Sequence, residues 1–136
     1  MSANIDLVRS IYADWERGDY YSSTAWAHPE IEFVVMDGPS PGGLTGVSAV
    51  EDNWRVFQET WEDYRVSAND YRELDADRVL VLARFSGRGK TSGLEMAQLA
   101  ANIFTLRAGK VVALTIYWDR DRAFADLGLT PEGEEV

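Results

Sequence analysis

The sequence predicts an α+β domain in which helices come first and a curved antiparallel sheet follows. Apolar residues recur at helical spacing in the N-terminal half, most strongly between Val47 and Trp61. From Tyr64 onward the pattern changes to that of strands. The strand candidates are joined by links too short for crossover connections, so neighbouring strands should pair antiparallel. We expect the sheet to be curved, with the helices lying against its concave side.

The N-terminal half contains further expected elements before Val47. A first helix should end at Gly18, because glycine readily adopts the left-handed conformation that stops a helix. A short second helix is expected from Asp19 to about Ala27, where His28-Pro29 ends it, since a residue before proline avoids the α region. Residues 31–37 alternate as a strand does. Residues 38–43 form a loop by their glycine and proline content.

The C-terminal half is expected to hold four strands and one helix. The strands are residues 65–74, 78–87, 93–107 and 110–119. The helix runs from about Arg120 to Leu127 and stops at Gly128. The tail from Thr130 to Val136 is expected to be mobile, which leaves a single domain over residues 1–129.

Composition excludes several classes of function. The formal net charge of −10 repels phosphate backbones and anionic lipids, so neither nucleic acid nor a membrane is expected as a partner. Cysteine is absent and His28 is the single histidine, which argues against thiolate sites, paired-histidine metal sites and a Ser/His triad. We therefore expect neither a metal nor a cofactor, and a structural role for His28. No apolar run approaches the roughly 20 residues of a membrane span, and a cytoplasmic protein is the default expectation.

Two polar residues are notable because each lies on an otherwise apolar predicted strand. Asp37 comes nine positions before Gly46, which opens a predicted helix, and Asn102 comes seven positions before the hairpin residue Gly109. A carboxylate and an amide that face one apolar cavity would make a minimal acid–base site. Each residue also has a structural alternative. Asp37 is equally suited to a turn, and Asn102 to bridging strands or holding a buried water.

The direction of Asn102 depends on the hairpin around Gly109. A three-residue loop over residues 107–109 would pair Leu106 with Lys110 and set Asn102 opposite Leu114. Asn102 would then share its side of the sheet with Gln98, Ala100, Phe104, Ile116 and Trp118. A two-residue loop would instead place it beside Thr115, Tyr117 and Asp119. We prefer the three-residue loop because it makes the inner face apolar.

Five segments resemble the nuclear transport factor 2-like superfamily, and most of all its SnoaL-like branch. They are Trp15–Asp19, His28–Glu32, Leu106–Val111, Ile116–Arg120 and Ala123–Leu129. Together they extend over nearly the whole chain. The resemblance implies a cone-shaped, cystatin-like α+β barrel with a central pocket. It also implies a homodimer joined through the sheet.

Within that superfamily, the ketosteroid isomerase pattern is similar in where its polar groups stand. Its catalytic aspartate, before a Pro/Gly-rich loop, corresponds to Asp37, and its polar donor before the final hairpin corresponds to Asn102. The resemblance implies that Asp37 moves a proton next to a ligand carbonyl, while Asn102 donates an N–H to the oxygen that gains charge. The pattern departs at the first helix, where its tyrosine falls on Ile11 and Tyr12 lies about 100° around the helix. The residues expected to line the pocket for an apolar small molecule are Tyr12, Trp15, Trp26, Trp54, Phe57, Gln98 and Trp118.

Three interpretations of function stay open. The first is an isomerase or polyketide-cyclase-like acid–base enzyme without metal or cofactor. The second is a non-catalytic protein that binds an apolar ligand, and the third is a dimeric interaction domain whose cavity is filled by side chains. An epoxide hydrolase of the same superfamily would need an Asp-Arg-Asp set, for which Arg84 is the strand-borne arginine. Asp119 is either a rival site residue or the N-cap of the last helix.

Overall fold

The computed structural model describes residues 3–20, 25–37 and 41–129. The helices in this part of the chain are α1 (Ala3–Glu16), α2 (Val47–Glu59) and α3 (Arg120–Leu127). The strands are β1 (Ala27–Val35), β2 (Gly42–Thr45), β3 (Trp61–Glu73), β4 (Arg78–Gly89), β5 (Glu95–Arg107) and β6 (Lys110–Tyr117). None of these helices is long and apolar enough to cross a membrane, within the described ranges.

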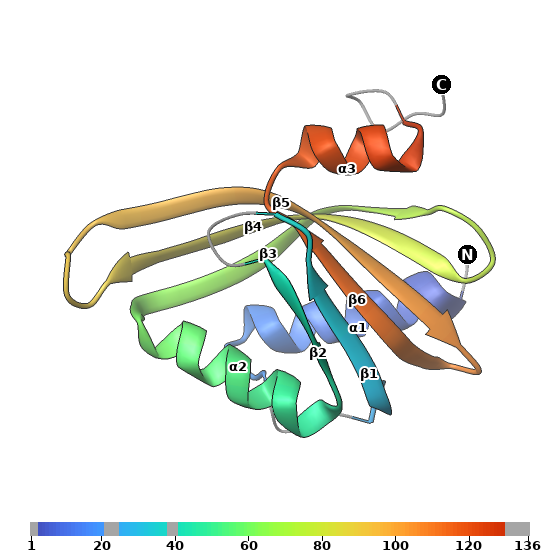
Figure 1. Cartoon of the computed structure of the whole chain (residues 1–136), viewed down its shortest axis with the longest axis horizontal. Helices are drawn as coiled ribbons and strands as arrows, with labels where there is room; N and C mark the ends of the chain where they lie inside the picture. The colour runs from blue at the N-terminus through green and yellow to red at the C-terminus, as the bar shows by residue number, and fades with distance from the viewer. Residues whose placement is uncertain (1–2, 21–24, 38–40, 130–136) are drawn as a thin grey trace.

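One curved sheet organises the fold, with the strand order β2-β1-β6-β5-β4-β3. Neighbouring strands are antiparallel except β1 and β6, which run parallel. Figure 1 shows the sheet curled around α1 and α2, while α3 lies on the other side. The predicted α+β fold with a curved sheet is confirmed. Two details were wrong: the sheet is mixed, because a long stretch of chain separates β1 from β6, and α3 lies outside the concave face.

The larger hydrophobic core fills the space between the concave face and α1. Val8, Ile11, Tyr12 and Trp15 are the buried residues of α1, and they recur at helical spacing. They pack on alternate residues of the central strands, among them Val79, Val81, Phe104 and Leu114. Burying an aliphatic or aromatic side chain of this size contributes about 1.5–3 kcal/mol. Apolar burial therefore holds α1 in the concavity.

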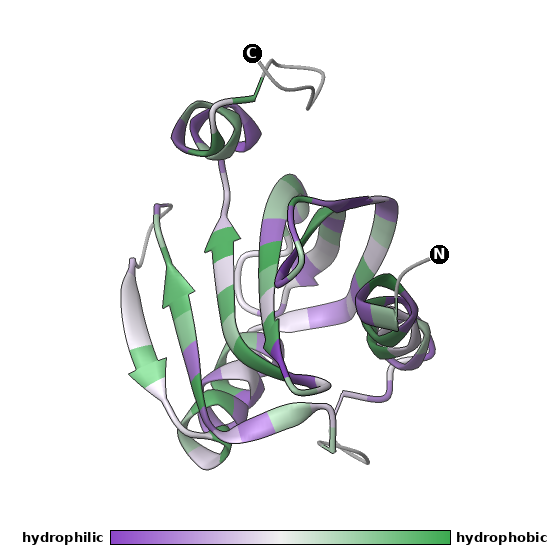
Figure 2. Ribbon diagram, turned by 90° about the vertical axis from the view of Figure 1, so that its right-hand side faces the viewer, coloured by the Kyte–Doolittle hydropathy of each residue, from purple (hydrophilic) through white to green (hydrophobic). Residues whose placement is uncertain are grey.

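A second cluster lies between the convex face and α3. Leu80, Ile103 and Tyr117 of the sheet pack with Ala123 and Phe124 of α3. The strand residues of this cluster alternate in sequence with those of the first, as side chains on opposite faces of a strand must. Figure 2 shows the result, with hydrophobic colour running along the central strands and α3 standing across the sheet from the other helices. The central strands are therefore apolar on both faces.

Both ends of α3 are fixed by local chemistry. The Asp119 carboxylate accepts hydrogen bonds from the backbone N–H groups of Asp121 at 2.9 Å and Arg122 at 3.4 Å. Gly128 follows the helix in the left-handed conformation, with φ of 71°. These are an N-cap and a glycine stop, and the helix spans the residues that the sequence predicts. Of its two expected roles, Asp119 has the capping one.

The chain around β1 differs from the prediction. Within the helix expected from Asp19 to about Ala27, residues 21–24 lie outside the described residues. Residues 19, 20, 25 and 26 are not helical, and Ala27 already begins β1. His28 and Pro29 lie within β1 and do not end a helix. The pairing of β1 with β6 is interrupted between Ala27 and Glu32, so the missing N–H of Pro29 breaks no ladder bond. The His28 Nδ1 atom accepts a hydrogen bond from the Glu30 N–H at 3.0 Å.

Strand β2 occupies part of the expected loop. Gly42 and Gly43 pair with Val35 and Val34 of β1, which makes β2 the edge of the sheet. Two glycines in a row weaken a strand signal because they have no side chain to pack. The segment is ordered by pairing with β1, a tertiary interaction that the local sequence does not reveal.

The β5–β6 hairpin has a different register from the predicted one. Arg107 pairs with Lys110 around a two-residue turn, in which Ala108 and Gly109 have φ of 53° and 77°. Positive φ at both positions is typical of a type I′ hairpin turn. The expected three-residue loop was therefore wrong.

A bulge next to this turn restores the predicted face. The pairing shifts between Thr105 and Leu106, so that one extra residue stands on β6. Asn102 consequently lies opposite Ile116, two residues from the predicted partner Leu114. Because the turn and the bulge compensate, Asn102 still shares the concave side with both of these residues.

Candidate functional site

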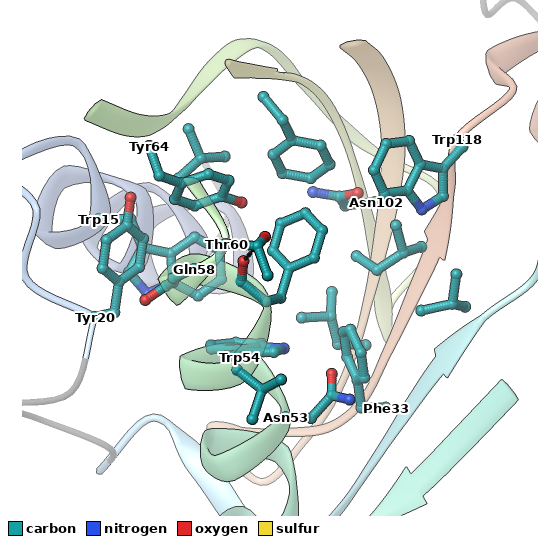
Figure 3. Close-up of a pocket in the computed structure, with 17 residues that line it drawn as sticks. Trp15, Tyr20, Phe33, Asn53, Trp54, Gln58, Thr60, Tyr64, Asn102 and Trp118 are labelled. Atoms are coloured by element: carbon teal, nitrogen blue, oxygen red, sulfur yellow. Dashed lines mark hydrogen bonds between the residues drawn. The ribbon is translucent and has the colours of Figure 1, made fainter. Parts of the chain in front are cut away.

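A cavity of about 400 Å³ lies between α2, the end of α1 and the concave face of the sheet. Eight of its 17 lining residues are aromatic, and the lining comes from α1, α2, β1, β3, β4, β5, β6 and the chain next to them. Figure 3 shows how these side chains surround the cavity. The aromatic rings include Trp15, Phe33, Trp54, Phe57, Phe85 and Trp118. A concave, apolar space of this size with few polar groups is typical of a site for a small molecule.

Four of the residues expected in the wall lie there. Trp15 comes from α1, Trp54 and Phe57 from α2, and Trp118 from the chain just after β6. The helix α2 presents this apolar side because residues 54 and 57 are three positions apart, and therefore share one face. About 400 Å³ remains open between these rings, whereas the interpretation as an interaction domain expected side chains to fill the cavity.

Three other expected wall residues lie elsewhere. Tyr12 is fully buried behind the wall. Trp26 packs edge-on against Trp15, with ring centroids 6.0 Å apart, and lies outside the cavity. The amide nitrogen of Gln98 donates a hydrogen bond to the Trp118 carbonyl at 2.8 Å, so this side chain supports the chain beside Trp118 and does not line the cavity.

Asn102 is the buried polar side chain of the cavity wall. Its amide nitrogen donates a hydrogen bond of 2.6 Å to the Tyr12 hydroxyl, and the residue is 1% exposed. Its amide oxygen is buried and has no hydrogen-bond partner within the part of the chain that the structure describes. In Figure 3 the oxygen end of the amide lies on the side of Trp118. Burial raises the pKa of Tyr12 far above its usual range, so this hydroxyl stays protonated.

Asp37 is tied to the backbone at the edge of the site. Its carboxylate accepts hydrogen bonds from the backbone N–H groups of Trp118 at 2.6 Å and Asp119 at 3.3 Å. It does not line the cavity, although Val35, two residues earlier, does. β1 ends at Val35, so the alternation that would have turned Asp37 inward no longer applies. The structure therefore does not bring the Asp37 carboxylate and the Asn102 amide onto one surface of the cavity.

Several wall residues were not in the expected set. Phe33 and Val35 of β1 and Leu114 of β6 line the cavity, and strand alternation alone placed them on the same faces as the candidate residues. Thr60, in the turn between α2 and β3, and Tyr64, near the start of β3, also line it. The Thr60 hydroxyl is committed to the Phe57 carbonyl, to which it donates at 2.6 Å. No pattern in the sequence marks this turn as part of a wall.

Charge is absent from the described part of the wall. None of the lining residues in residues 3–20, 25–37 and 41–129 is Asp, Glu, Lys, Arg or His. Arg84, the arginine that an epoxide hydrolase site would have needed, is exposed and lies on β4 between Ala83 and Phe85 of the inner face. It does not line the cavity. The cavity can therefore bind through apolar contact and hydrogen bonding, but its wall offers no ion pair.

The structure is thus a small α+β domain in which a curved sheet and two helices enclose an apolar cavity. The family model of the SnoaL-like domain matches residues 8–114 of the chain. The protein belongs to this family, which confirms the resemblance that its sequence segments indicate. Among curated proteins, none matches the chain.

Solved structures share the fold over nearly the whole chain. An NTF2-like protein from Burkholderia pseudomallei has a TM-score of 0.77 at 20% identity, with 92% of this chain and 97% of that chain covered. A second NTF2-like protein, from Burkholderia thailandensis, has a TM-score of 0.75 at 27% identity, with 85% and 90% covered. TerC, co-crystallised with polyporic acid, has a TM-score of 0.74 at 22% identity, with 93% and 98% covered. These similarities show a nuclear transport factor 2-like fold.

Proposed function

We propose that the protein binds an apolar, oxygenated small molecule in the cavity beneath α2. The observation that supports this most strongly is the cavity itself, about 400 Å³ of unfilled space lined by eight aromatic and five aliphatic residues, with the buried amide of Asn102 among its polar groups. Apolar contact with such walls favours the ligand, and the amide gives it a polar anchor. TerC, which shares the fold, was co-crystallised with the small molecule polyporic acid. That similarity adds support for a ligand but does not identify it.

The proposal can be tested with a neutral fluorescent probe and a pair of matched variants. Val35 lines the cavity, whereas its neighbour Val34 points to the other face of β1, and both are half-buried. Val35→Phe should fill part of the cavity, while Val34→Phe adds the same volume outside it. We expect N-phenyl-1-naphthylamine to brighten with the wild type and with Val34→Phe, but much less with Val35→Phe. Equal brightening with both variants would place the probe elsewhere and contradict the proposal.

Acid–base catalysis by Asp37 is the second candidate function. One contact favours this candidate. The Asp37 carboxylate accepts a hydrogen bond from the backbone N–H of Trp118, and Trp118 lines the cavity. The carboxylate therefore lies just behind the wall. An acid–base isomerase or cyclase would use such a group to move a proton next to a ligand carbonyl. The absence of a carboxylate from the described wall is the reason that this candidate comes second.

Proton exchange separates a catalyst from a binder. We would follow the exchange of the α protons of 2-tetralone with solvent deuterium by NMR, in the presence of wild type, Asp37→Asn and Asp121→Asn. Asp121 is an exposed carboxylate in the first turn of α3 and serves as the matched control. A catalyst should accelerate exchange in the wild type and in Asp121→Asn but not in Asp37→Asn. Exchange at the buffer rate with all three proteins would leave binding as the function.

The homodimer joined through the sheet remains a prediction of the family resemblance. Light scattering coupled to size-exclusion chromatography would test it directly.

A further inference from the structure

The nitrogen and the oxygen of the Asn102 amide have different surroundings. Its nitrogen is engaged by the Tyr12 hydroxyl at 2.6 Å, on the side of α1. Its oxygen is buried and has no hydrogen-bond partner among the described residues, and Asn102 is one of the residues that line the cavity. A buried carbonyl oxygen without a hydrogen bond is energetically costly, and native structures rarely leave one. The molecule that fills the cavity is the obvious source of the missing donor.

The surrounding wall limits what that molecule is. The described wall has no charged side chain, so an ionic group on the ligand would lose its hydration without gaining a partner. The protein's net charge of −10 further disfavours an anion. The ligand is therefore neutral where it contacts the wall.

The geometry of the rings indicates a flat ligand. Trp15 and Trp54 meet nearly at right angles, with centroids 5.4 Å apart, and Phe57 and Trp118 do the same at 6.3 Å. A corner formed by two perpendicular rings presents one face and one edge. An aromatic ring placed in such a corner can make offset-stacked and edge-to-face contacts together.

We propose, on the basis of the binding function above, that Asn102 Oδ1 accepts a hydrogen bond from a hydroxyl group of the ligand. The chemical class selected is a neutral, planar aromatic molecule that carries a phenolic or enolic O–H. This assignment differs from the sequence-based hypothesis, in which Asn102 donates an N–H to a ligand oxygen. The difference follows from two observations: Tyr12 takes one of the two N–H donors of the amide, and the amide oxygen is the buried atom left without a partner.

Three naphthalenes that differ in one substituent test the assignment. 2-Naphthol has an O–H donor, 2-methoxynaphthalene has the same oxygen without a donor, and 2-acetylnaphthalene has a carbonyl acceptor. We would measure their dissociation constants by isothermal titration calorimetry at pH 7, where 2-naphthol is neutral. A net hydrogen bond of ordinary strength corresponds to about a five- to tenfold preference for 2-naphthol over the methyl ether. 2-Acetylnaphthalene should bind no more tightly than the ether.

Two variants assign the preference to Asn102. Asn102→Leu should abolish the preference for 2-naphthol while the ether still binds. Asn4→Leu is the matched control, because the Asn4 amide donates to the Ala76 carbonyl at 2.8 Å and lies outside the cavity wall. This variant should keep the preference. If Asn102→Leu fails to fold, the order of the three affinities in the wild type still decides.

Each remaining outcome is distinct. Three outcomes would overturn the assignment of Oδ1 as an acceptor and leave the binding function standing. They are equal affinities for all three compounds, a preference for 2-naphthol that survives Asn102→Leu, and tightest binding of 2-acetylnaphthalene. No binding of any of the three would overturn the proposed function, and this inference with it.

Discussion

The hydroxyl of Tyr12 on α1 and the amide of Asn102 on β5 form a buried hydrogen bond of 2.6 Å between residues 90 positions apart. Both side chains are almost completely inaccessible to solvent. The bond links the first helix to the middle of the sheet, immediately behind the cavity. It therefore serves both the stability of the fold and the orientation of the polar group in the cavity wall.

Tyr12→Phe should destabilise the protein through this bond. The variant keeps the ring and removes the hydroxyl, which leaves the Asn102 nitrogen buried without its partner. An unsatisfied buried polar group costs about 1–3 kcal/mol, so the free energy of unfolding should fall by that amount. Urea denaturation measures it. A double-mutant cycle with Asn102→Leu should show a coupling of about 0.5–3 kcal/mol, and additive effects would mean that the two side chains do not interact.

The sequence predicted the two members of this pair for different reasons and did not predict the pair. Asn102 was identifiable because an amide on an apolar strand is unusual. Tyr12 was identifiable as part of a helical stripe. Their contact depends on how α1 is rotated against the sheet, and a rotation of about 100° separates Tyr12 from Ile11. That angle is set by packing across the whole concave face.

Asp37 should contribute to stability as a link between strands. Its carboxylate joins the end of β1 to the residues that follow β6. Hydrogen bonds to a charged group contribute about 1.5–3 kcal/mol, so Asp37→Ala should lower the free energy of unfolding by that amount. Asp37→Asn should cost less, because an amide oxygen still accepts one of the two bonds. Glu32→Gln, at an exposed position of β1, is the control and should change stability by less than about 0.5 kcal/mol. A similar loss for the control and for Asp37→Ala would contradict the link.

The case of Asp37 shows how far strand alternation extends. Alternation correctly grouped Phe33 with Val35, and both line the cavity. Alternation did not place Asp37 correctly, because β1 ends at Val35. The Asp37 carboxylate instead binds the backbone N–H of Trp118, just after β6. Similarly, the β5–β6 turn was predicted one residue too long, and a bulge compensated for the error. Periodicity predicts a face within a strand, but strand ends and bulges depend on neighbouring strands.

Arg120 should be sensitive to substitution by lysine. Its guanidinium donates hydrogen bonds to the Ala83 carbonyl at 2.8 Å, the Ala100 carbonyl at 3.1 Å and the Asn69 side chain at 3.2 Å. These acceptors lie on β4, β5 and β3, so one side chain connects three strands to the start of α3. Burial lowers the pKa of Arg120, which shows that the group is partly desolvated.

The ammonium group of a lysine cannot reproduce this planar fork. Arg120→Lys should therefore lower the free energy of unfolding by about 1–3 kcal/mol, from the buried bonds that are lost. Arg107→Lys, at the exposed last residue of β5, serves as the control and should have little effect. Thermal or urea unfolding of the two variants provides the measurement. Equal stability of Arg120→Lys and the wild type would show that the three contacts add nothing.

Alkaline pH should weaken the convex side of the fold through Tyr117. Its hydroxyl donates a hydrogen bond of 2.8 Å to the Asp126 carboxylate of α3. Burial, followed by this carboxylate, raises the pKa of Tyr117 from 10.0 to about 12. A phenol with a raised pKa in the folded state favours folding fully below the unfolded pKa. That contribution is lost as the pH rises from about 10 to about 12, because the unfolded chain releases the proton first.

Tyr117→Phe isolates this effect because phenylalanine does not ionise. The melting temperatures of the wild type and the variant should differ by a constant amount from pH 8 to about pH 10, and the difference should then shift against the wild type toward pH 12. Tyr12, whose pKa is also raised, remains in both proteins and cancels from the comparison. Asp126→Asn is the second comparison, since loss of the neighbouring charge should shrink the alkaline shift. A difference between wild type and Tyr117→Phe that stays constant up to pH 12 would show that Tyr117 ionises equally easily in the folded and unfolded states.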